Sequence, residues 1–311
     1  MTNEINNMIR KANQELAGLE KNYIRQFDLP KGPVFFIVGA PRSGTTVLLQ
    51  TIINHFSVAY INNFIAKFWK APVIGSIFFK SISDSQPELA YHSKGGFTSD
   101  IYGPHEFGYF WRRFFPYGES HELKKEVHKN IDVQTLNREI SGLEIHLEKP
   151  LIFKNPAALS LQIDFLSKYI PNSYFIYIKR KPFYIAQSLL LKRIDKFKNP
   201  DIWYSVKPSN YKQLIQKPPV EQVSGQVFYT IRKIEEDLSE ISDERVFQLN
   251  YEEFCENPIL LLSQFEILRK FILSDSLEKA KDLTFKNNNQ ILIDKENADN
   301  LKSHLEELYQ S

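Results

Sequence analysis

Short apolar runs along the chain alternate with longer segments whose apolar residues recur every three or four positions. The short runs are rich in β-branched and aromatic residues, which predicts buried strands, and the longer segments have the spacing of amphipathic helices. The predicted strands cover residues 34–38, 57–61, 151–153, 174–178 and 245–250, and the predicted helices cover 3–27, 46–56, 64–82 (broken near Pro72 and Gly75), 133–147, 157–170, 182–193, 220–241, 258–272 and a last segment from about Lys295.

Strands that alternate with helices predict an α/β fold, in which a mostly parallel sheet carries helices on both faces. The long loop predicted at 83–103 is of a kind that is usually functional or mobile in a compact domain. We expect a single domain over residues 1–311, with an N-terminal helix at 3–27, a core at 33–272, helical insertions at about 62–148 and 196–241, and a C-terminal loop and helix at 275–311.

Composition narrows the class of protein. The net charge of +2 gives no indication of a nucleic-acid partner. Cys255 is the single cysteine, so neither an intrachain disulfide nor a cysteine-based metal site is expected. The chain has no apolar run of about 18 residues and its N-terminus lacks the apolar core of a signal peptide. We therefore expect no membrane span and a cytoplasmic location.

A glycine-containing loop, GAPRSGTT, joins the first predicted strand to the first helix of the core. Gly39, Gly44 and Thr46 fit the nucleotide-hydrolase pattern G-x4-G-K-[ST], but Thr45 occupies the place of the lysine. A strand, a glycine-rich loop and a helix form the context in which backbone N–H groups and the helix dipole bind a phosphate. The sequence thus predicts a P-loop-like sheet, although a turn with this spacing can also arise by chance.

The missing lysine changes the expected ligand, because that side chain normally reaches the terminal phosphates of a nucleoside triphosphate. The loop keeps its backbone amides, the Arg42 guanidinium and the hydroxyls of Ser43, Thr45 and Thr46. This set suits a group with less charge than a triphosphate. A 5′-phosphosulfate, handled without a metal, fits that description.

Polar residues also follow three later strands. Lys154, Arg180 and Tyr251 each come at or directly after a strand end. Ligands of parallel α/β sheets bind beyond the carboxyl ends of the strands. We therefore expect these residues and the glycine-containing loop to lie along one edge of the sheet.

These segments resemble a known family. The sequence APRSGTT followed by Leu48 is similar to the 5′-phosphosulfate loop of sulfotransferases that use 3′-phosphoadenosine 5′-phosphosulfate (PAPS). The segment SYFIYIKRKPFYIAQSLL resembles their 3′-phosphate motif, although Lys181 stands where members usually have an acidic residue. The resemblance implies that PAPS is bound by Arg42, Ser43, Gly44, Thr45, Thr46, Arg180 and Ser188.

The resemblance also implies catalytic residues. LIFKNP is similar to a segment of tyrosyl-protein sulfotransferases and related bacterial enzymes, in which the residue at Lys154 contacts the sulfuryl group and stabilises the leaving phosphate. Arg42 would contact the same sulfuryl group, together with Ser43, Thr45 and Thr46. The family uses Glu or His as the base, and Glu106 and His105 are the candidates, with Glu106 preferred by resemblance to the Glu-using branch. Tyr251 is expected to be structural.

The sequence therefore predicts transfer of a sulfuryl group from PAPS to a hydroxyl or amine of a small-molecule, lipid or glycan acceptor. Aromatic residues in 64–80 and 107–117 suggest an apolar-lined pocket, although those at 107–117 also fit a core helix. One alternative is a P-loop kinase, which Thr45 and the lack of an evident Walker B aspartate argue against. Another is a non-catalytic nucleotide-binding protein of the same fold. The oligomeric state is not predicted.

Overall fold

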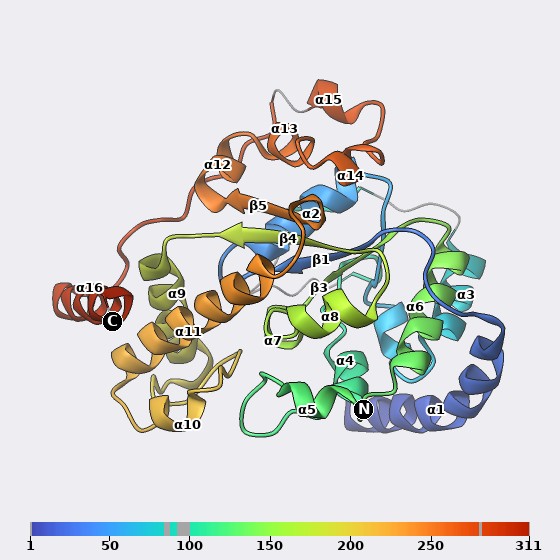
Figure 1. The fold of residues 1–311 in the computed structure, drawn as a ribbon, viewed down its shortest axis with the longest axis horizontal. Coiled ribbons are helices and arrows are strands. Elements are labelled where there is room, and N and C mark those ends of the chain that lie inside the picture. The colour runs from blue at the N-terminus through green and yellow to red at the C-terminus, as the bar shows by residue number, and fades with distance from the viewer. Residues whose placement is uncertain (1, 84–87, 92–99, 280–281, 311) are drawn as a thin grey trace.

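The computed structural model describes residues 2–83, 88–91, 100–279 and 282–310, and most of the loop predicted at 83–103 lies outside these ranges. At its centre is a five-stranded sheet with the order β2-β3-β1-β4-β5, in which every neighbouring pair is parallel. The arrows of β4 and β5 point the same way in Figure 1. The strands are β1 Val34–Val38, β2 Ala59–Tyr60, β3 Leu151–Lys154, β4 Ser173–Lys179 and β5 Val246–Asn250.

Helices cover both faces of this sheet, which confirms the predicted α/β class (Figure 1). The α-helices are α1 Thr2–Tyr23, α2 Thr45–His55, α3 Pro72–Ile82, α4 Gly108–Phe114, α5 Lys125–His128, α6 Val133–Leu147, α7 Pro156–Leu159, α8 Ile163–Tyr169, α9 Pro182–Phe197, α10 Tyr211–Leu214, α11 Pro219–Ser239, α12 Tyr251–Glu256, α13 Pro258–Leu262, α14 Glu266–Arg269, α15 Ser276–Lys279 and α16 Lys295–Gln310, and the 3₁₀ helices are η1 Ile24–Gln26, η2 Ile65–Phe68 and η3 Asp243–Arg245.

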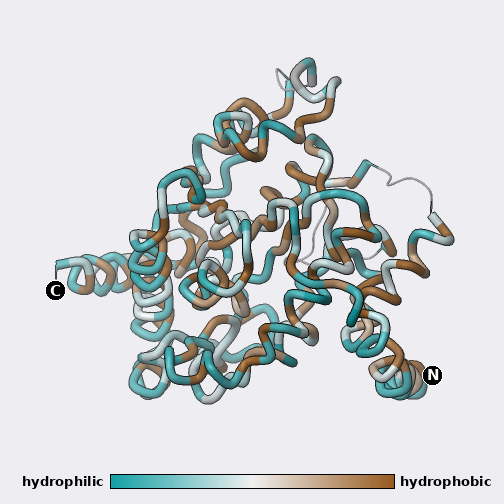
Figure 2. Tube along the Cα trace, turned by 45° about the vertical axis from the view of Figure 1, so that its right-hand side comes forward, coloured by the Kyte–Doolittle hydropathy of each residue, from teal (hydrophilic) through white to brown (hydrophobic). Residues whose placement is uncertain are grey.

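The central strand β1 shows how the two layers are built. All five of its residues are buried. Because successive side chains of a strand point to opposite faces, Phe36 packs with α4, α6 and α8, whereas Phe35 and Ile37 pack with α2 and the helices after β5. The hydrophobic stretches accordingly gather in the middle of the molecule in Figure 2, and hydrophilic stretches lie along the outer helices.

Three predicted helices have internal breaks that differ from the prediction. The segment 157–170 divides into α7 and α8, and the hydroxyl of Ser160, in the turn between them, binds the Gly39 backbone. The segment 258–272 divides into α13 and α14, and the intervening turn lets Phe265 pack edge-on against Phe35 in the core. The segment 64–82 breaks before Pro72 as predicted, but Gly75 lies inside α3.

Gly75 has a packing role rather than a helix-breaking one. A Cβ atom at this position would lie 2.7 Å from the Phe68 Cβ, so only glycine lets α3 approach η2 this closely. None of the helices in the described residues is both long enough and apolar enough to cross a membrane.

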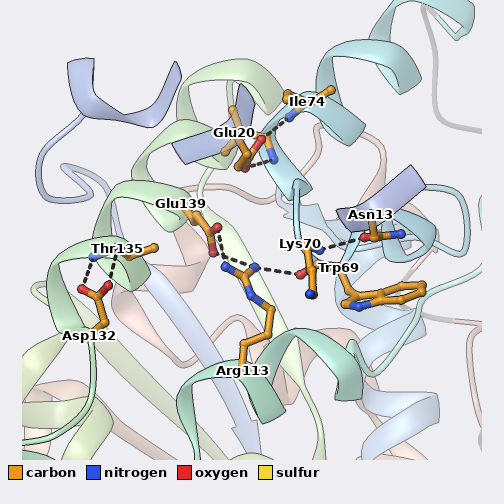
Figure 3. A network of polar contacts seen from close by, with 10 residues as sticks. Asn13, Glu20, Trp69, Lys70, Ile74, Arg113, Asp132, Thr135 and Glu139 are labelled. Carbon is orange, nitrogen blue, oxygen red and sulfur yellow. Dashed lines mark hydrogen bonds and ion pairs between the residues drawn. The ribbon is translucent and has the colours of Figure 1, made fainter. Parts of the chain in front are cut away.

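Buried ionic groups join α1, α3, α4 and α6 (Figure 3). The Glu20 carboxylate accepts hydrogen bonds from the backbone N–H groups of Val73 and Ile74, at 2.8 and 3.0 Å. These N–H groups belong to the first turn of α3, where no intrahelical acceptor is available. The Arg113 guanidinium donates both to the Trp69 carbonyl and to the Glu139 carboxylate. The network therefore fixes the helices on the side of the sheet that carries Glu106.

Burial dominates the titration of both carboxyl groups. Burial raises the pKa of Glu20 to about 7, although the two backbone N–H groups and the Arg113 charge oppose the rise. Burial likewise raises the pKa of Glu139 to about 7 against the influence of Arg113. Between about pH 4.5 and 7, the folded protein therefore holds protons that the unfolded chain has released, so stability falls as the pH rises through this window.

Replacing Glu20 tests this linkage. Glu20→Gln keeps an acceptor for the α3 N–H groups but removes the titration. We expect the difference in the free energy of unfolding, variant minus wild type, to increase by about 1–3 kcal/mol as the pH rises from about 5 to 8. Urea unfolding at several pH values measures the difference. Glu240→Gln, at an exposed position, serves as the control. If the difference in the free energy of unfolding between Glu20→Gln and wild type does not change with pH, the account is contradicted.

Candidate active site

A cavity of about 250 Å³ lies where β1, β3, β4 and β5 end. Residues that follow four different strands meet in it, as expected for a parallel sheet. The side chains at its wall include three cations and one carboxylate. The lining residues are Pro41, Arg42, Gly44, Thr45, Thr46, Val47, Glu106, Lys154, Pro156, Ala157, Arg180, Tyr204, Ser205, Tyr251 and Asn288.

The loop after β1 is held in an unusual backbone conformation. Arg42 and Gly44 have φ angles of 77° and 102°, in the left-handed region. A Cβ atom on Gly44 would lie 2.7 Å from the Tyr251 ring, so glycine is required here for space as well as for its backbone angle. The start of the loop is fixed by Ser160, whose hydroxyl accepts from the Gly39 N–H and donates to the Gly39 carbonyl.

The N-terminus of α2 faces the cavity. Thr45 and Thr46, its first two residues, both line the wall. Backbone N–H groups in the first turn of a helix have no intrahelical acceptor, and the first bond within α2 runs from the Leu48 N–H to the Gly44 carbonyl. Free backbone N–H donors and the positive end of the α2 dipole therefore face the cavity, and together they favour binding of an anion.

Ser43 is placed differently from its neighbours. Its side chain is fully buried, and its hydroxyl has no hydrogen-bond partner among the described residues. The Ser43 N–H donates to the Ala40 carbonyl within the turn, at 3.1 Å. Ser43 is not among the lining residues, so in this structure it belongs to the buried side of the loop.

Arg180, after β4, is oriented by several contacts. Its Nε donates to the Asn289 side chain at 2.8 Å, and its two terminal nitrogens donate to the Arg42 and Asn288 carbonyls. Its guanidinium lies over the Tyr251 ring at 4.5 Å. These bonds use three of the five N–H donors of an arginine, and two remain for a ligand. Burial lowers the pKa of Arg180, but the neighbouring Tyr251 and Glu252 oppose that change.

Ser188, on α9, connects to the loop through Arg42. The Arg42 Nε donates to the Ser188 hydroxyl at 3.0 Å. Ser188 does not line the cavity itself, although Arg42 does. Arg42, Arg180 and Ser188 thus form one connected group between the loop and the start of α9.

Lys154 and Glu106 form an ion pair at the wall of the cavity. The Lys154 Nζ lies 2.6 Å from the Glu106 Oε1, and the side chains are 4% and 34% exposed, respectively. The lysine is therefore buried up to its charged end, while the carboxylate remains accessible. The next residue, Asn155, donates from its side chain to the Glu106 carbonyl at 3.0 Å. The end of β3 thereby holds Glu106 by both its side chain and its backbone.

His105 is bound to the backbone beside Glu106. Its Nδ1 accepts a hydrogen bond from the Phe107 N–H at 2.8 Å, and it does not line the cavity. Burial lowers the pKa of His105, and the Glu106 carboxylate offsets part of that effect. The bond also stabilises a turn in which Phe107 has a φ angle of 55°. Glu106 lines the cavity, whereas its neighbour Phe107 is buried in the core.

The phenylalanine and tryptophan side chains of 107–117 pack in the core, where Phe110 and Trp111 are fully buried, whereas Tyr109 is exposed. No residue of 64–80 or 107–117 lines this cavity. Tyr251 lies under Arg180 at the cavity wall. Tyr204 and Ser205 were not singled out by motif, since they lie in an irregular loop between α9 and α10. The described residues contain no group of three or more His, Cys, Asp or Glu side chains that could hold a metal.

Comparisons with known proteins identify a family and a fold. A model of the sulfotransferase family matches residues 33–264 of the 311, which is more than half of the chain. No curated protein matches in sequence. The sulfotransferase STF9 from Mycobacterium avium has a TM-score of 0.60 at 15% identity, over 97% of this chain and 83% of that protein. The sulfotransferase STF1 from Mycobacterium tuberculosis has a TM-score of 0.54 at 12% identity, over 94% and 81%. These two likenesses concern the fold.

Proposed function

This chain belongs to the sulfotransferase family, and we propose that it transfers a sulfuryl group from PAPS to a hydroxyl or amine of an acceptor molecule. The observation that carries the proposal is the charge of the cavity. Arg42, Lys154 and Arg180 converge there with the N-terminus of α2, and Thr45 stands where a triphosphate-binding loop has lysine. This set matches a nucleotide with separate phosphate groups better than a triphosphate chain.

The cavity offers two places for the phosphate groups of the donor. The amides of Thr45 and Thr46 and the Lys154 ammonium would hold the 5′-phosphosulfate. The free N–H donors of Arg180, with the nearby Ser188 hydroxyl, would hold the 3′-phosphate, because a guanidinium binds phosphate through paired charge-assisted hydrogen bonds. PAPS supplies the sulfuryl group and leaves as adenosine 3′,5′-bisphosphate.

Glu106 is the proposed base. Its Oε1 is paired with Lys154, and its carboxylate is accessible from the cavity, so it can accept the proton of an acceptor hydroxyl. Lys154 lines the cavity together with Thr45 and Thr46 of the phosphate-binding loop. As negative charge develops on the departing phosphate, the ammonium can stabilise it without leaving its position. His105 is the weaker candidate, because its Nδ1 already accepts a backbone hydrogen bond.

The acceptor is proposed only as a class. A small molecule, a lipid or a glycan with a free hydroxyl or amine would satisfy the chemistry. The polar residues at the cavity wall neither select among these classes nor favour a polyanionic acceptor.

Ligand binding tests the donor assignment. We expect adenosine 3′,5′-bisphosphate to bind in the presence of a chelator, and Arg180→Gln to weaken this binding about 10- to 100-fold, because two charge-assisted hydrogen bonds are lost. Titration calorimetry provides the measurement. Lys270→Gln removes the same charge from an exposed position beside the far end of α2 and should bind like wild type. Binding of ATP with magnesium in place of the bisphosphate would support a kinase instead.

Turnover of radiolabelled PAPS with a panel of phenols, alcohols and amines tests the base. We expect Glu106→Gln to lower kcat by about 10²- to 10⁴-fold with little change in bisphosphate affinity, because a positioned base contributes to the transition state. His105→Asn should retain most of the activity. The assignment of Glu106 fails if its glutamine variant turns over PAPS like wild type, or if only the His105 variant is inactive.

A further inference from the structure

The loop between α9 and α10 returns to the cavity and places Tyr204 and Ser205 in its wall. Ser205 has a φ angle of 72°, which is uncommon for a residue with a side chain. Such conformations persist only where surrounding contacts enforce them, and they gather at functional sites. The contacts that enforce this one come from α9 and α11.

Gln226, on α11, binds the backbone carbonyls of the residues on either side of Ser205. Its side-chain Nε2 donates to the Tyr204 carbonyl at 2.8 Å and to the Val206 carbonyl at 2.7 Å. Both carbonyls therefore point toward α11. The Trp203 indole N–H closes the same turn by donating to the Val206 carbonyl at 2.9 Å.

Arg193, on α9, in turn orients Gln226. The Arg193 guanidinium donates to the Gln226 Oε1 at 3.0 Å, which fixes the Nε2 of that amide toward the loop. It also donates to the Pro200 carbonyl and lies over the Trp203 ring at 4.8 Å. Arg193 and Gln226 are both fully buried. A buried arginine is costly to desolvate, so its presence is better explained by the geometry that it imposes than by stability alone.

The loop is also tied to the segment after α4. The His121 N–H donates to the Lys207 carbonyl at 2.8 Å, and the Ser120 hydroxyl donates to the same carbonyl at 3.0 Å. Contacts from α9, α11 and this segment therefore act on the stretch 203–207. Tyr204 and Ser205, within this stretch, are thereby held at the wall of the cavity.

We infer that Arg193 and Gln226 are positioning residues, which hold Tyr204 and Ser205 against the bound sulfonucleotide so that Ser205 contacts it. The inference rests on the proposed function for the identity of that ligand. The positioning itself depends only on the contacts among α9, α11 and the loop.

Two glutamines of α11 provide a matched test. Gln226→Glu keeps the acceptor for Arg193 but removes the amide N–H groups that hold the carbonyls beside Ser205. Gln222 is buried in the same way and also accepts from Arg193, at 2.7 Å, but its Nε2 donates to the carbonyls of Ile215 and Lys217, in a different turn. Gln222→Glu therefore makes the same chemical change but removes no hydrogen bond to residues 203–207.

Hydrogen exchange measures the positioning directly. We expect amides of 203–207 to exchange about tenfold faster in Gln226→Glu, because two buried hydrogen bonds are lost. In Gln222→Glu the faster exchange should occur around 215–217 instead. Equal protection of 203–207 in wild type and both variants would overturn the inference.

Binding of adenosine 3′,5′-bisphosphate measures the consequence. We expect about tenfold weaker binding in Gln226→Glu and unchanged binding in Gln222→Glu. If wild type binds and both variants bind equally well, the inference fails while the proposed function stands. If wild type does not bind but 203–207 still loosens only in Gln226→Glu, the proposed donor is wrong and the positioning role stands.

Ser205→Gly provides a second route if Gln226→Glu does not fold. Glycine adopts positive φ angles readily, so this variant should be at least as stable as wild type. It lacks the Ser205 hydroxyl, and we expect several-fold weaker bisphosphate binding. Unchanged affinity in a more stable Ser205→Gly protein would contradict the contact between Ser205 and the ligand.

Discussion

The parallel pairing of β1 with both β3 and β4 is the constraint on which the cavity depends. The register places Ile37 opposite Lys154 on one side and Val38 opposite Tyr177 on the other. The chain therefore leaves these strands at one edge of the sheet and brings positive groups together there. Mutual repulsion among them is reduced by the Glu106 carboxylate and by backbone carbonyls, and a bound anion would reduce it further.

Polar side chains from other parts of the chain hold the backbone segments that line the cavity at this edge. Ser160 holds the start of the phosphate loop, Asn155 holds the backbone of Glu106, and Gln226 holds the loop that carries Ser205. Each is a buried or half-buried polar side chain that bonds to backbone at the site. The network around Arg113 has a similar effect at a greater distance, because it fixes the helices on which the Glu106 turn rests.

Much of this arrangement follows from local sequence signals. The strand and loop at 34–46 and the strand end at Arg180 could be predicted because glycine positions, apolar runs and a proline at a helix start each have a local physical cause. The boundaries of α6 were also predicted, and Asp132 accepts from the Thr135 N–H at its start. The contact between Ser160, in the turn from α7 to α8, and Gly39 could not be predicted, because the two residues are far apart in sequence. The wall at Tyr204 and Ser205 was missed for the same reason.

The most direct test of the central claim is a crystal structure of the protein with adenosine 3′,5′-bisphosphate. The account predicts the 5′-phosphate at the N-terminus of α2, within reach of the Lys154 ammonium, and the 3′-phosphate beside Arg180. A nucleotide bound in the reverse orientation, or outside the cavity at the ends of β1, β3 and β4, would contradict the account.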